Sequence, residues 1–450
     1  MDTNQRLAKY DRLVPRYTSY PTAPHFSGAV TPADYAAWLR GLPEDAPLSL
    51  YLHVPFCASL CLFCACHTTV VNQRAPLEAY AQTLLMEIDL VSRTIGRRQK
   101  VQHIHWGGGT PTSLPPTAMR DIMTRLRAFF DVVDDAEVAV EIDPRTLSAA
   151  SLDALAEMGT TRASLGVQDF DPKVQEAINR HQDLALTTQC AERLRGAGIR
   201  SLNLDLIYGL PYQTTGGIRD TVRQALGLRP DRVAVFGYAH VPWMKKHQAL
   251  IPDASLPGRD ERYAQQQAAE AAIAEAGYVR VGLDHFALPD DALAQASLSN
   301  SLKRNFQGYT TDAAPVLLGL GASSIGSLPD GYVQNHPGVP AWRDAVHNGT
   351  LPIARGIALT PADRLRRDVI EQIMCGFAVD LAETAARHDS SPAGLMDAAP
   401  ALQEMERDGL VHWEGYQLSV TQAGRPFVRN VAAAFDTWLQ PGAGRHSSAV

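Results

Sequence analysis

Short apolar runs alternate with amphipathic stretches through much of this chain, and this alternation limits the folds open to it. Six apolar runs lie between about residue 48 and 290: Leu48–Phe56, Val101–Trp106, Glu137–Ile142, Arg162–Val167, Ser201–Tyr208 and Arg232–Ala239. The stretches between them with helical periodicity include Leu77–Ile95, Thr117–Phe130, Leu184–Ala197 and Ile218–Leu228. Repeated strand-then-helix units are typical of a parallel sheet covered by helices. Six units predict an incomplete or full α/β barrel, although periodicity alone fits an open doubly wound sheet almost as well.

Chemically useful residues follow the ends of these runs. The segments at the run ends read HVPFC, HWGGGTP, EIDP, GVQDF, DLIYGLP and GYAHVP. Active sites of parallel α/β folds gather at the carboxyl ends of the strands. These segments are therefore expected to form one site, although they are distant in sequence.

The two ends of the chain lack this alternation of strands and helices. Residues 1–47 are expected to form an N-terminal extension that closes the active site, and residues 48–350 the barrel with an extension. Residues 351–450 predict a small, mostly helical C-terminal domain. Within it, Leu410–Thr421 predicts a winged-helix-like hairpin with its turn at Gly415, followed by a helix over 426–439. Its final helices carry few basic residues, so packing as a lid or wall is a better interpretation than DNA binding.

The charge balance and the first residues limit location and partners. The chain has 41 Lys and Arg against 48 Asp and Glu, a net charge of −7, which argues against nonspecific nucleic-acid binding. Residues 1–10 are too polar for a signal peptide, and no apolar run is long enough to span a bilayer. We predict a cytoplasmic protein with neither nucleic acid nor membrane as a partner.

Four of the six cysteines lie within ten residues, directly after the first apolar run. The loop reads Cys57-Ala-Ser-Leu-Cys61-Leu-Phe-Cys64-Ala-Cys66. Such a group in a reducing compartment favours metal binding over disulfides. Thiolates spaced four and three residues apart can wrap around three corners of a [4Fe–4S] cluster. The fourth iron is then open to a chelating amino acid such as S-adenosylmethionine. A four-cysteine zinc site is the alternative, but zinc sites favour paired C-x2-C units.

These motifs resemble known proteins. C-x3-C-x2-C after a first strand resembles the radical S-adenosylmethionine superfamily. A longer set resembles the oxygen-independent coproporphyrinogen III dehydrogenase family: PRYTSYPTA, YLHVPFC, HWGGGTPT, GVQDF, NLDLIYGLP, YAHVP, DHFA, RNFQGYTT and GIALT. These segments cover about residues 15 to 360, and RRDVI and VRNV-x3-FDT extend the resemblance to about 437. The resemblance implies a radical S-adenosylmethionine partial (β/α)6-type barrel, a monomer, one [4Fe–4S] cluster and two S-adenosylmethionine molecules.

The resemblance also assigns individual positions. Cys57, Cys61 and Cys64 match the cluster ligands, and Cys66 is expected to stay off the fourth iron. Positions that match contacts to the cluster-bound S-adenosylmethionine are Tyr51, Gly108, Gly109, Thr110, Glu141 and Ile325. Positions that match a second S-adenosylmethionine site are Phe63, Gln168, Arg180, Asp205 and Ala239.

Several of these positions have a plainer structural interpretation. The three consecutive glycines allow close backbone approach to a ligand, or simply form a turn. Glu141 can be interpreted as a solvated residue at a strand end, and Arg180 as an exposed cation at a helix end. Ile325 can be interpreted as part of the core. Asp205 suits a buried strand-end carboxylate that holds a ribose.

The reaction implied by the resemblance is two oxidative decarboxylations of coproporphyrinogen III, giving protoporphyrinogen IX in haem biosynthesis. The propionate C–H bond is unactivated, so a cofactor must supply the chemistry. A 5′-deoxyadenosyl radical from S-adenosylmethionine takes the hydrogen, and loss of carbon dioxide and one electron leaves a vinyl group. An unidentified reductant and electron acceptor are implied. The substrate carboxylates need cationic partners, for which arginine is well suited, and Arg12 and Arg16 are candidates.

A haem chaperone of the same superfamily is the alternative function. Such relatives share the barrel and the three cluster cysteines. They usually lack the fourth cysteine and the PRYTSYPTA segment, both of which are present here. We therefore prefer the enzyme.

Overall fold

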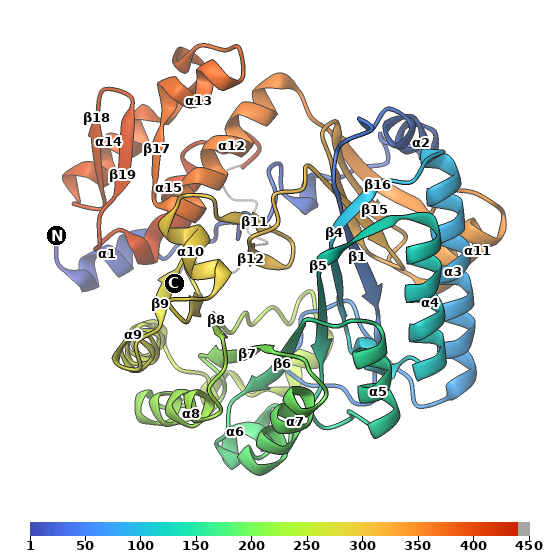
Figure 1. Ribbon diagram of the computed structural model, residues 1–450. Coiled ribbons are helices and arrows are strands. Elements are labelled where there is room, and N and C mark those ends of the chain that lie inside the picture. The colour runs from blue at the N-terminus through green and yellow to red at the C-terminus, as the bar shows by residue number, and fades with distance from the viewer. Residues whose placement is uncertain (440–450) are drawn as a thin grey trace.

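A twelve-stranded mixed sheet forms the centre of the computed structural model, which describes residues 1–439 (Figure 1). Its strands lie side by side in this order: β16 (Ile353–Ala358), β15 (Gly331–Asn335), β14 (Ile325–Leu328), β13 (Val316–Leu320), β1 (Leu48–Val54), β4 (Lys100–Gly108), β5 (Asp131–Ile142), β6 (Arg162–Gln168), β7 (Ser201–Tyr208), β8 (Arg232–Gly237), β10 (His285–Ala287) and β9 (Val279–Val281). Neighbours from β13 to β8 run parallel, and the outer strands pair antiparallel.

The strand order confirms a partial barrel. The strands of the six predicted units follow one another in chain order from β1 to β8, without the reversal that a doubly wound sheet requires. Within residues 1–439 no ladder joins β16 to β9, so the curved sheet stays open. All six predicted strands are present, and β7 has the predicted bounds.

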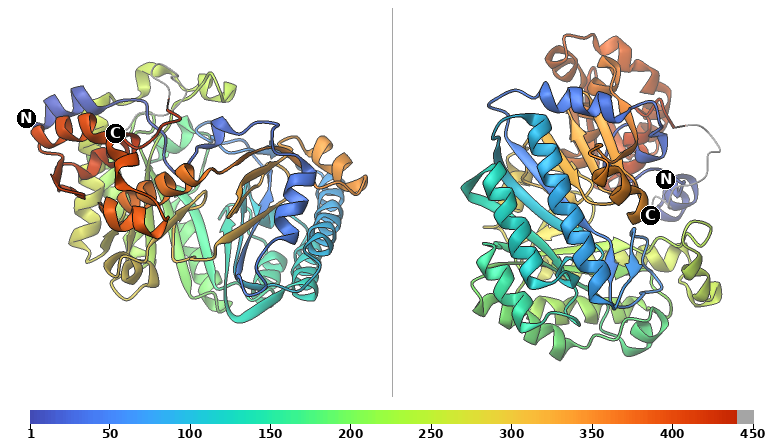
Figure 2. Two further views of the ribbon diagram at one scale, coloured as in Figure 1. Left: turned by 90° about the horizontal axis from the view of Figure 1, so that it is seen from above. Right: turned by 90° about the vertical axis from the view of Figure 1, so that its right-hand side faces the viewer.

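Helices cover the outer face of this sheet (Figures 1 and 2). They are α3 (Arg74–Ile95), α4 (Pro116–Phe129), α5 (Ala149–Glu157), α6 (Pro172–Ala177), α7 (Leu184–Gly196), α8 (Thr215–Gly227) and α9 (Arg259–Glu275). In α3 the buried side chains recur every three or four residues, from Leu77 to Ile95, and form one apolar stripe. The helix ends where Gly96 adopts a left-handed conformation with φ 77°. Residues from these helices and the strands share one large core.

Shorter elements fill the connections. They are η2 (Pro111–Ser113), η3 (Lys246–Leu250), η4 (Asp253–Ser255), α10 (Ala292–Leu298) and α11 (Val339–His347), with the two-stranded pairs β2 (Phe56–Cys57) with β3 (Thr69–Val70) and β11 (Lys303–Asn305) with β12 (Gly308–Thr310). No helix in the described range is long and apolar enough to cross a membrane.

The C-terminal residues form a second core beside the barrel. Its elements are α12 (Pro361–Gly376), α13 (Leu381–Arg387), η5 (Pro392–Ala398), α14 (Ala399–Arg407), η6 (Arg425–Phe427), α15 (Val428–Ala433) and a small sheet of β17 (Ala378–Asp380), β19 (Gln417–Val420) and β18 (Val411–Glu414). The hairpin of β18 and β19 turns at Gly415, as predicted. The predicted helix over 426–439 is wrong in extent, because the Asp436 carboxylate accepts from the N–H groups of Trp438 and Leu439 and forms a turn. Residues 440–450 of the predicted domain lie outside the described range.

The N-terminal residues divide between the two cores. Leu7 and Tyr10 of α1 (Thr3–Tyr10) are buried among the C-terminal helices, and Tyr17 and Tyr20 follow them. In Figure 2 α1 lies beside the C-terminal helices, although they are at opposite ends of the chain. After η1 (Ala23–His25), α2 (Pro32–Arg40) instead joins the core of the barrel. The chain thus ties the C-terminal core to the barrel before β1 begins.

Candidate active site

The cysteine loop starts at the carboxyl end of β1. Its base is closed by the short parallel pair of β2 and β3, in which Phe56 lies opposite Thr69 and Cys57 opposite Val70. The Thr69 N–H donates to the carbonyl of Pro55 at 2.7 Å, which holds the two ends together. Cys57, Cys61 and Cys64 therefore lie on a closed loop at the edge of the sheet where the other strand ends gather.

Hydrogen-bond donors surround the thiols. The Thr110 hydroxyl lies 3.7 Å from the Cys57 sulfur. Two guanidinium groups reach Cys61: Arg145 Nη2 at 3.5 Å and Arg180 Nη1 at 3.6 Å. Donors and positive charge stabilise thiolates, which are the form that binds iron. The donor set therefore fits an iron–sulfur cluster.

No three Cys, His, Asp or Glu side chains within residues 1–439 converge closely enough to hold a single metal ion. Each cysteine ligand of a [4Fe–4S] cluster binds a different iron, so such sulfurs surround the cluster and need not meet at one point.

Cys66 interacts with its neighbour Cys64. The hydrogen bond between the two side chains lowers the pKa of Cys64 to about 6 and raises the pKa of Cys66 well above its usual value. The pair therefore holds one negative charge more readily than two. That Cys66 is not an iron ligand stays a prediction.

The glycine segment after β4 lies against the start of the cysteine loop. The Gly109 N–H donates to the Val54 carbonyl at 2.8 Å, and a Cβ on Gly109 would lie 2.6 Å from the Phe56 oxygen. Gly108 has φ 114°, and its Cβ would lie 2.7 Å from the His53 ring. Glycine is therefore required at these two positions because a side chain would collide with neighbouring residues, whether or not the positions also contact a ligand.

Glu141 is fixed by two donors. Its carboxylate accepts from the Gly108 N–H at 3.1 Å, and His105 Nε2 lies 3.3 Å away. Burial opposes ionisation, but His105 and the Gly108 N–H outweigh it and lower the pKa of Glu141. The carboxylate is consequently charged, and with 38% of its side chain exposed it remains accessible to a ligand.

His53 connects Tyr51 to the cysteine loop. His53 Nε2 lies 3.2 Å from the carbonyl of His67, and Nδ1 lies 3.0 Å from the Tyr51 hydroxyl. A carbonyl only accepts, so Nε2 carries the proton and Nδ1 accepts from Tyr51. Burial lowers the pKa of His53, which keeps the ring neutral. Residue Gly319 lies opposite Tyr51 in the β1–β13 register and against the backbone of Ile325, so Ile325 lies on the same side of the site.

Asp205 lies on β7, farther around the curved sheet. It accepts from the hydroxyl of Ser164 at 2.9 Å and from the amide of Asn203 at 2.8 Å, and burial raises its pKa. Asp205 and Glu141 line the same cavity of about 220 Å³ inside the barrel. The structure thus brings one residue from each predicted S-adenosylmethionine site into a single space.

Arg180 and Gln168 meet beside Gly166. A Cβ on Gly166 would lie 2.9 Å from Gln168 Nε2 and 3.2 Å from Arg180 Nη2. Arg180 is only 6% exposed, donates to the Gly166 carbonyl at 2.6 Å and lies 3.5 Å from Asp143. The interpretation of Arg180 as an exposed helix-end cation is therefore wrong.

A buried glutamine joins the remaining predicted positions, Phe63 and Ala239. Gln248 Nε2 donates to both of their carbonyls, at 2.8 and 3.2 Å, and the Gln248 side chain is wholly buried. This contact ties the cysteine loop to the end of β8.

Sequence reasoning missed several residues that hold the loop. Gln248 and Arg145 are two of them, and His247 Nε2 lies 2.7 Å from the Cys64 carbonyl. Lys245 donates to the Cys66 carbonyl at 2.8 Å. Arg145 could have been found, because it follows the EIDP strand end directly. Residues 245–248 lie in a connection without a recognisable signal.

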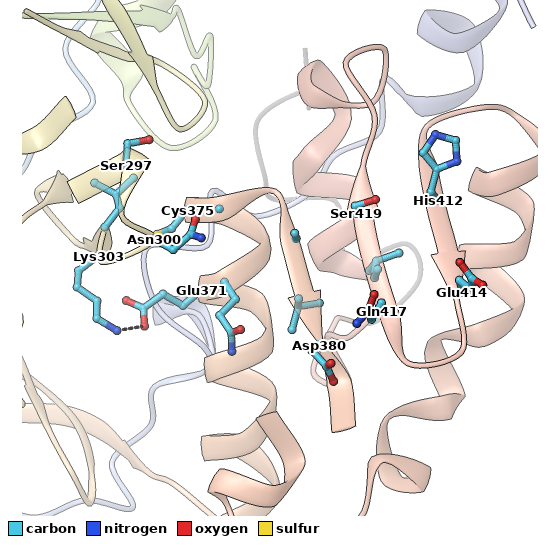
Figure 3. A pocket seen from close by; sticks show the side chains of 16 residues that line it. Ser297, Asn300, Lys303, Glu371, Cys375, Asp380, His412, Glu414, Gln417 and Ser419 are labelled. Atoms are coloured by element: carbon cyan, nitrogen blue, oxygen red, sulfur yellow. Dashed lines mark hydrogen bonds and ion pairs between the residues drawn. The ribbon is translucent and has the colours of Figure 1, made fainter. Parts of the chain in front are cut away.

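A cavity of about 450 Å³, larger than the one inside the barrel, lies elsewhere. Figure 3 shows residues of α10, β11, α12 and the C-terminal hairpin around it, with Lys303 and Glu371 paired at 3.2 Å. None of the predicted site residues line it. Volume alone therefore does not locate the active site in this molecule.

Comparison with known proteins identifies the family. Residues 51–225 match the model of the radical SAM superfamily, and residues 359–427 match that of the HemN C-terminal domain. An oxygen-independent coproporphyrinogen III oxidase of Bradyrhizobium diazoefficiens is 52% identical over 440 residues, covering 98% of each chain. That of Paracoccus denitrificans is 43% identical over 446 residues, covering 99% of this chain and 98% of the relative.

A solved structure agrees. The coproporphyrinogen III oxidase of Escherichia coli, described as a radical SAM enzyme, superposes with a TM-score of 0.89 at 37% identity, covering 95% of this chain and all of that one. Together with the cysteine loop, these matches show that the chain belongs to the oxygen-independent coproporphyrinogen III oxidase family of radical S-adenosylmethionine enzymes.

Proposed function

We propose that this enzyme converts two propionate side chains of coproporphyrinogen III to vinyl groups without oxygen, giving protoporphyrinogen IX for haem biosynthesis. The observation that carries the proposal is the closed C-x3-C-x2-C loop at the carboxyl edge of a partial barrel, in a chain 52% identical to a relative of that name. When bound, the cluster and S-adenosylmethionine supply a 5′-deoxyadenosyl radical that takes hydrogen from the propionate β-carbon.

The residues of the chain position these groups. Cys57, Cys61 and Cys64 would hold three irons, and Thr110, Arg145 and Arg180 stabilise their thiolates. In the proposal, the first S-adenosylmethionine contacts Tyr51, Gly108, Gly109, Thr110, Glu141 and Ile325. The charge on Glu141 suits an ammonium or a ribose hydroxyl.

A second S-adenosylmethionine would contact Phe63, Gln168, Arg180, Asp205 and Ala239. Two arrangements support this grouping: Gln248 joins Phe63 to Ala239, and Gly166 brings Gln168 to Arg180. Asp205 has one oxygen bonded to Ser164 and the other to Asn203, which orients the carboxylate toward the barrel interior.

The remaining expectations concern organisation and partners. We propose a division into an N-terminal extension over 1–47, a barrel with its extension over 48–350 and a C-terminal domain over 351–450. Tyr17 and Tyr20 are buried in the C-terminal core and also line a cavity with Leu317 of β13 and Ser327 of β14, which supports closure of the site by the extension. The enzyme is proposed to act as a cytoplasmic monomer, with an external reductant and electron acceptor and without nucleic-acid or membrane partners.

The test is anaerobic turnover of coproporphyrinogen III by the reconstituted protein. Wild type should consume the substrate and form divinyl product with release of 5′-deoxyadenosine. A Cys61→Ser variant should lose turnover, while Cys190→Ser, which alters a buried cysteine on α7, should retain it. Turnover by Cys61→Ser would refute the mechanism. Stoichiometric haem binding without turnover by wild type would instead support the chaperone.

A further inference from the structure

Four arginines from distant parts of the chain line one small cavity. Arg16 comes from the N-terminal segment, Arg262 from α9, Arg304 from β11 and Arg429 from α15. The cavity also contacts residues 208, 237 and 238, at the carboxyl ends of β7 and β8. It therefore lies at the active edge of the barrel, where the N-terminal segment and both cores meet.

Backbone carbonyls accept the hydrogen bonds that orient these arginines. Arg16 donates to Gly237 at 3.2 Å, Arg262 to Tyr238 at 2.9 Å and Arg304 to the carbonyl of Arg16 at 3.3 Å. Arg429 donates to the carbonyls of Val14 and Pro15. A carbonyl orients a guanidinium but does not neutralise its charge.

Negative charge in this cavity is scarce. Asp284 is the only carboxylate among the residues that line it. Burial opposes its ionisation, but the contact with His285 at 2.8 Å and the charges of Arg304 and Arg16 lower the pKa of Asp284 to about 2. Even without counting Arg429, one ionised carboxylate faces the guanidinium groups of Arg16, Arg262 and Arg304, which leaves a local excess of positive charge.

Arg304 has unused donors. Its Nε and Nη1 are buried without a hydrogen-bond partner within residues 1–439, and the guanidinium lies over the Tyr309 ring at 4.4 Å. Buried polar groups are normally paired, so two unpaired guanidinium nitrogens point to a missing acceptor. Burial, with the nearby Arg16 and Arg304, also lowers the pKa of Arg429 to about 9, an effect that a bound anion would oppose.

The size and position of the cavity suit one end of a large anion. Its volume of about 50 Å³ is enough for a few waters or one carboxylate, but not for a tetrapyrrole. Phe236 lines both this cavity and the barrel interior that contains Glu141 and Asp205. A carboxylate held here can therefore belong to a molecule whose body lies in the barrel.

We propose that Arg16, Arg262, Arg304 and Arg429 bind a propionate carboxylate of the substrate, one that the reaction retains. The inference rests on the proposed function. A guanidinium pair stabilises the carboxylate anion and so opposes its loss as carbon dioxide, which makes this an anchor for an unreactive propionate and not a site of decarboxylation. Of the two N-terminal arginines considered as candidates, Arg16 lines this cavity, whereas Arg12 does not and donates to the Lys9 carbonyl.

The experiment compares two arginines of one helix. Arg262→Gln removes a member of the anchor, and Arg259→Gln, one turn earlier on α9, removes an arginine paired with Asp260 outside the cavity. Affinity for the unreactive oxidised ligand coproporphyrin III is measured by fluorescence quenching, and KM by anaerobic turnover. Arg262→Gln should weaken binding and raise KM about tenfold or more, and Arg259→Gln should change neither.

Further measurements separate the effect of the charge, the position of the bound carboxylate and any loss of folding. Arg262→Lys should restore part of the affinity, and Arg304→Gln should weaken binding as Arg262→Gln does. The monovinyl intermediate, which keeps three propionates, should suffer the same increase in KM because the anchored carboxylate is still present. Iron content and melting temperature report whether each variant folds; if Arg304→Gln does not, Arg262→Gln decides alone.

Two results would overturn the proposal. One is coproporphyrin affinity in Arg262→Gln equal to that of Arg259→Gln. The other is unchanged coproporphyrin affinity together with lost binding of inorganic phosphate, which would indicate a site for free anions. In both cases turnover by wild type would leave the proposed function standing, whereas absence of wild-type turnover would refute that function first.

Discussion

At the scale of single residues, the sulfur of Cys61 has an unusual environment. Arg145 and Arg180 both approach it, and Asp143 binds Arg145 at 2.6 Å while lying 3.5 Å from Arg180. Hydrogen bonds and charge near the ligand sulfurs are among the factors that set the reduction potential of an iron–sulfur cluster. Asp143 offsets only part of the charge of the two guanidinium groups.

Removing one of these charges should alter the potential. An Arg145→Leu variant is expected to bind a cluster that is harder to reduce, because less positive charge stabilises the added electron. An anaerobic redox titration followed by electron paramagnetic resonance measures the midpoint potential. Arg193→Leu is the control, because Arg193 donates to the Leu147 carbonyl and not to a thiol. Equal midpoint potentials of the cluster in the two variants would contradict the expectation.

The two neighbouring cysteines, Cys64 and Cys66, should differ in how much each contributes to iron binding. Cys64→Ser is expected to lose most of its iron, while Cys66→Ser keeps the wild-type content, because Cys64 belongs to the C-x3-C-x2-C spacing and Cys66 lies outside it. Iron and acid-labile sulfide are measured after anaerobic reconstitution. Equal loss in both variants would make Cys66 a ligand.

How far single residues were predictable depends on sequence separation. The cysteines and Glu141 were predictable because spacing and strand ends place them. Gln248 was not, because it bonds to the carbonyl of Phe63, which is 185 residues away. Arg180 was assigned by resemblance, but its burial against Cys61 depends on a contact 119 residues away that no local pattern encodes.

At the scale of elements, a buried carboxylate of α3 joins that helix to three other elements. Glu87 of α3 accepts from the Gly321 N–H after β13 at 2.7 Å, from Asn335 at the end of β15 at 2.6 Å and from Trp342 of α11 at 3.0 Å. Burial raises the pKa of Glu87 to about 7, against a usual value of 4.5. The folded protein therefore retains a proton that the unfolded chain loses.

This linkage predicts the direction of a pH effect. Between pH 4.5 and 7 the native state binds more protons at Glu87 than the unfolded state, so the contribution of Glu87 to stability falls as the pH rises. From pH 5.5 to 7 the free energy of unfolding of wild type should fall by about 2 kcal/mol relative to Glu87→Gln. Anaerobic denaturant unfolding of both proteins tests this. A difference independent of pH would mean that Glu87 ionises normally in the fold.

Element boundaries were predictable where the pattern was periodic. Most strands and the α3, α4, α7 and α8 helices lie within a few residues of their predicted ends, since apolar periodicity reports burial directly. The exception is β5, which begins at Asp131 and not at the predicted Glu137. The last helix was predicted too long because one side chain, Asp436, redirects the backbone.

At the scale of the whole molecule, the N-terminal segment acts as a structural part of the C-terminal core. Leu7 and Tyr10 are each 1% exposed. Lys9 pairs with Glu404 and Asp408, and Tyr10 also donates to Asp408. No periodicity in the sequence predicted this pairing of distant ends, because each partner is amphipathic on its own.

Deleting residues 1–12 should therefore destabilise the C-terminal core. Loss of the Leu7 and Tyr10 side chains is expected to lower the melting temperature of that core, and Leu7→Ala alone should cost about 2–5 kcal/mol. Differential scanning calorimetry of the cluster-loaded protein measures both effects. Asn4→Ala, at an exposed position of α1, is the matched control. An unchanged transition after the deletion would contradict the packing role.

The same packing sets an order of assembly during synthesis. Arg6 bonds to a residue 402 positions later in the chain. At 5–20 residues per second, the ribosome needs roughly 20 to 80 s to make that stretch. Until then Leu7, Tyr10 and Tyr17 leave the ribosome with apolar surface that nothing native can cover, while the barrel folds behind them. The arginine anchor, which needs Arg16 and Arg429 together, is accordingly among the last features of the enzyme to form.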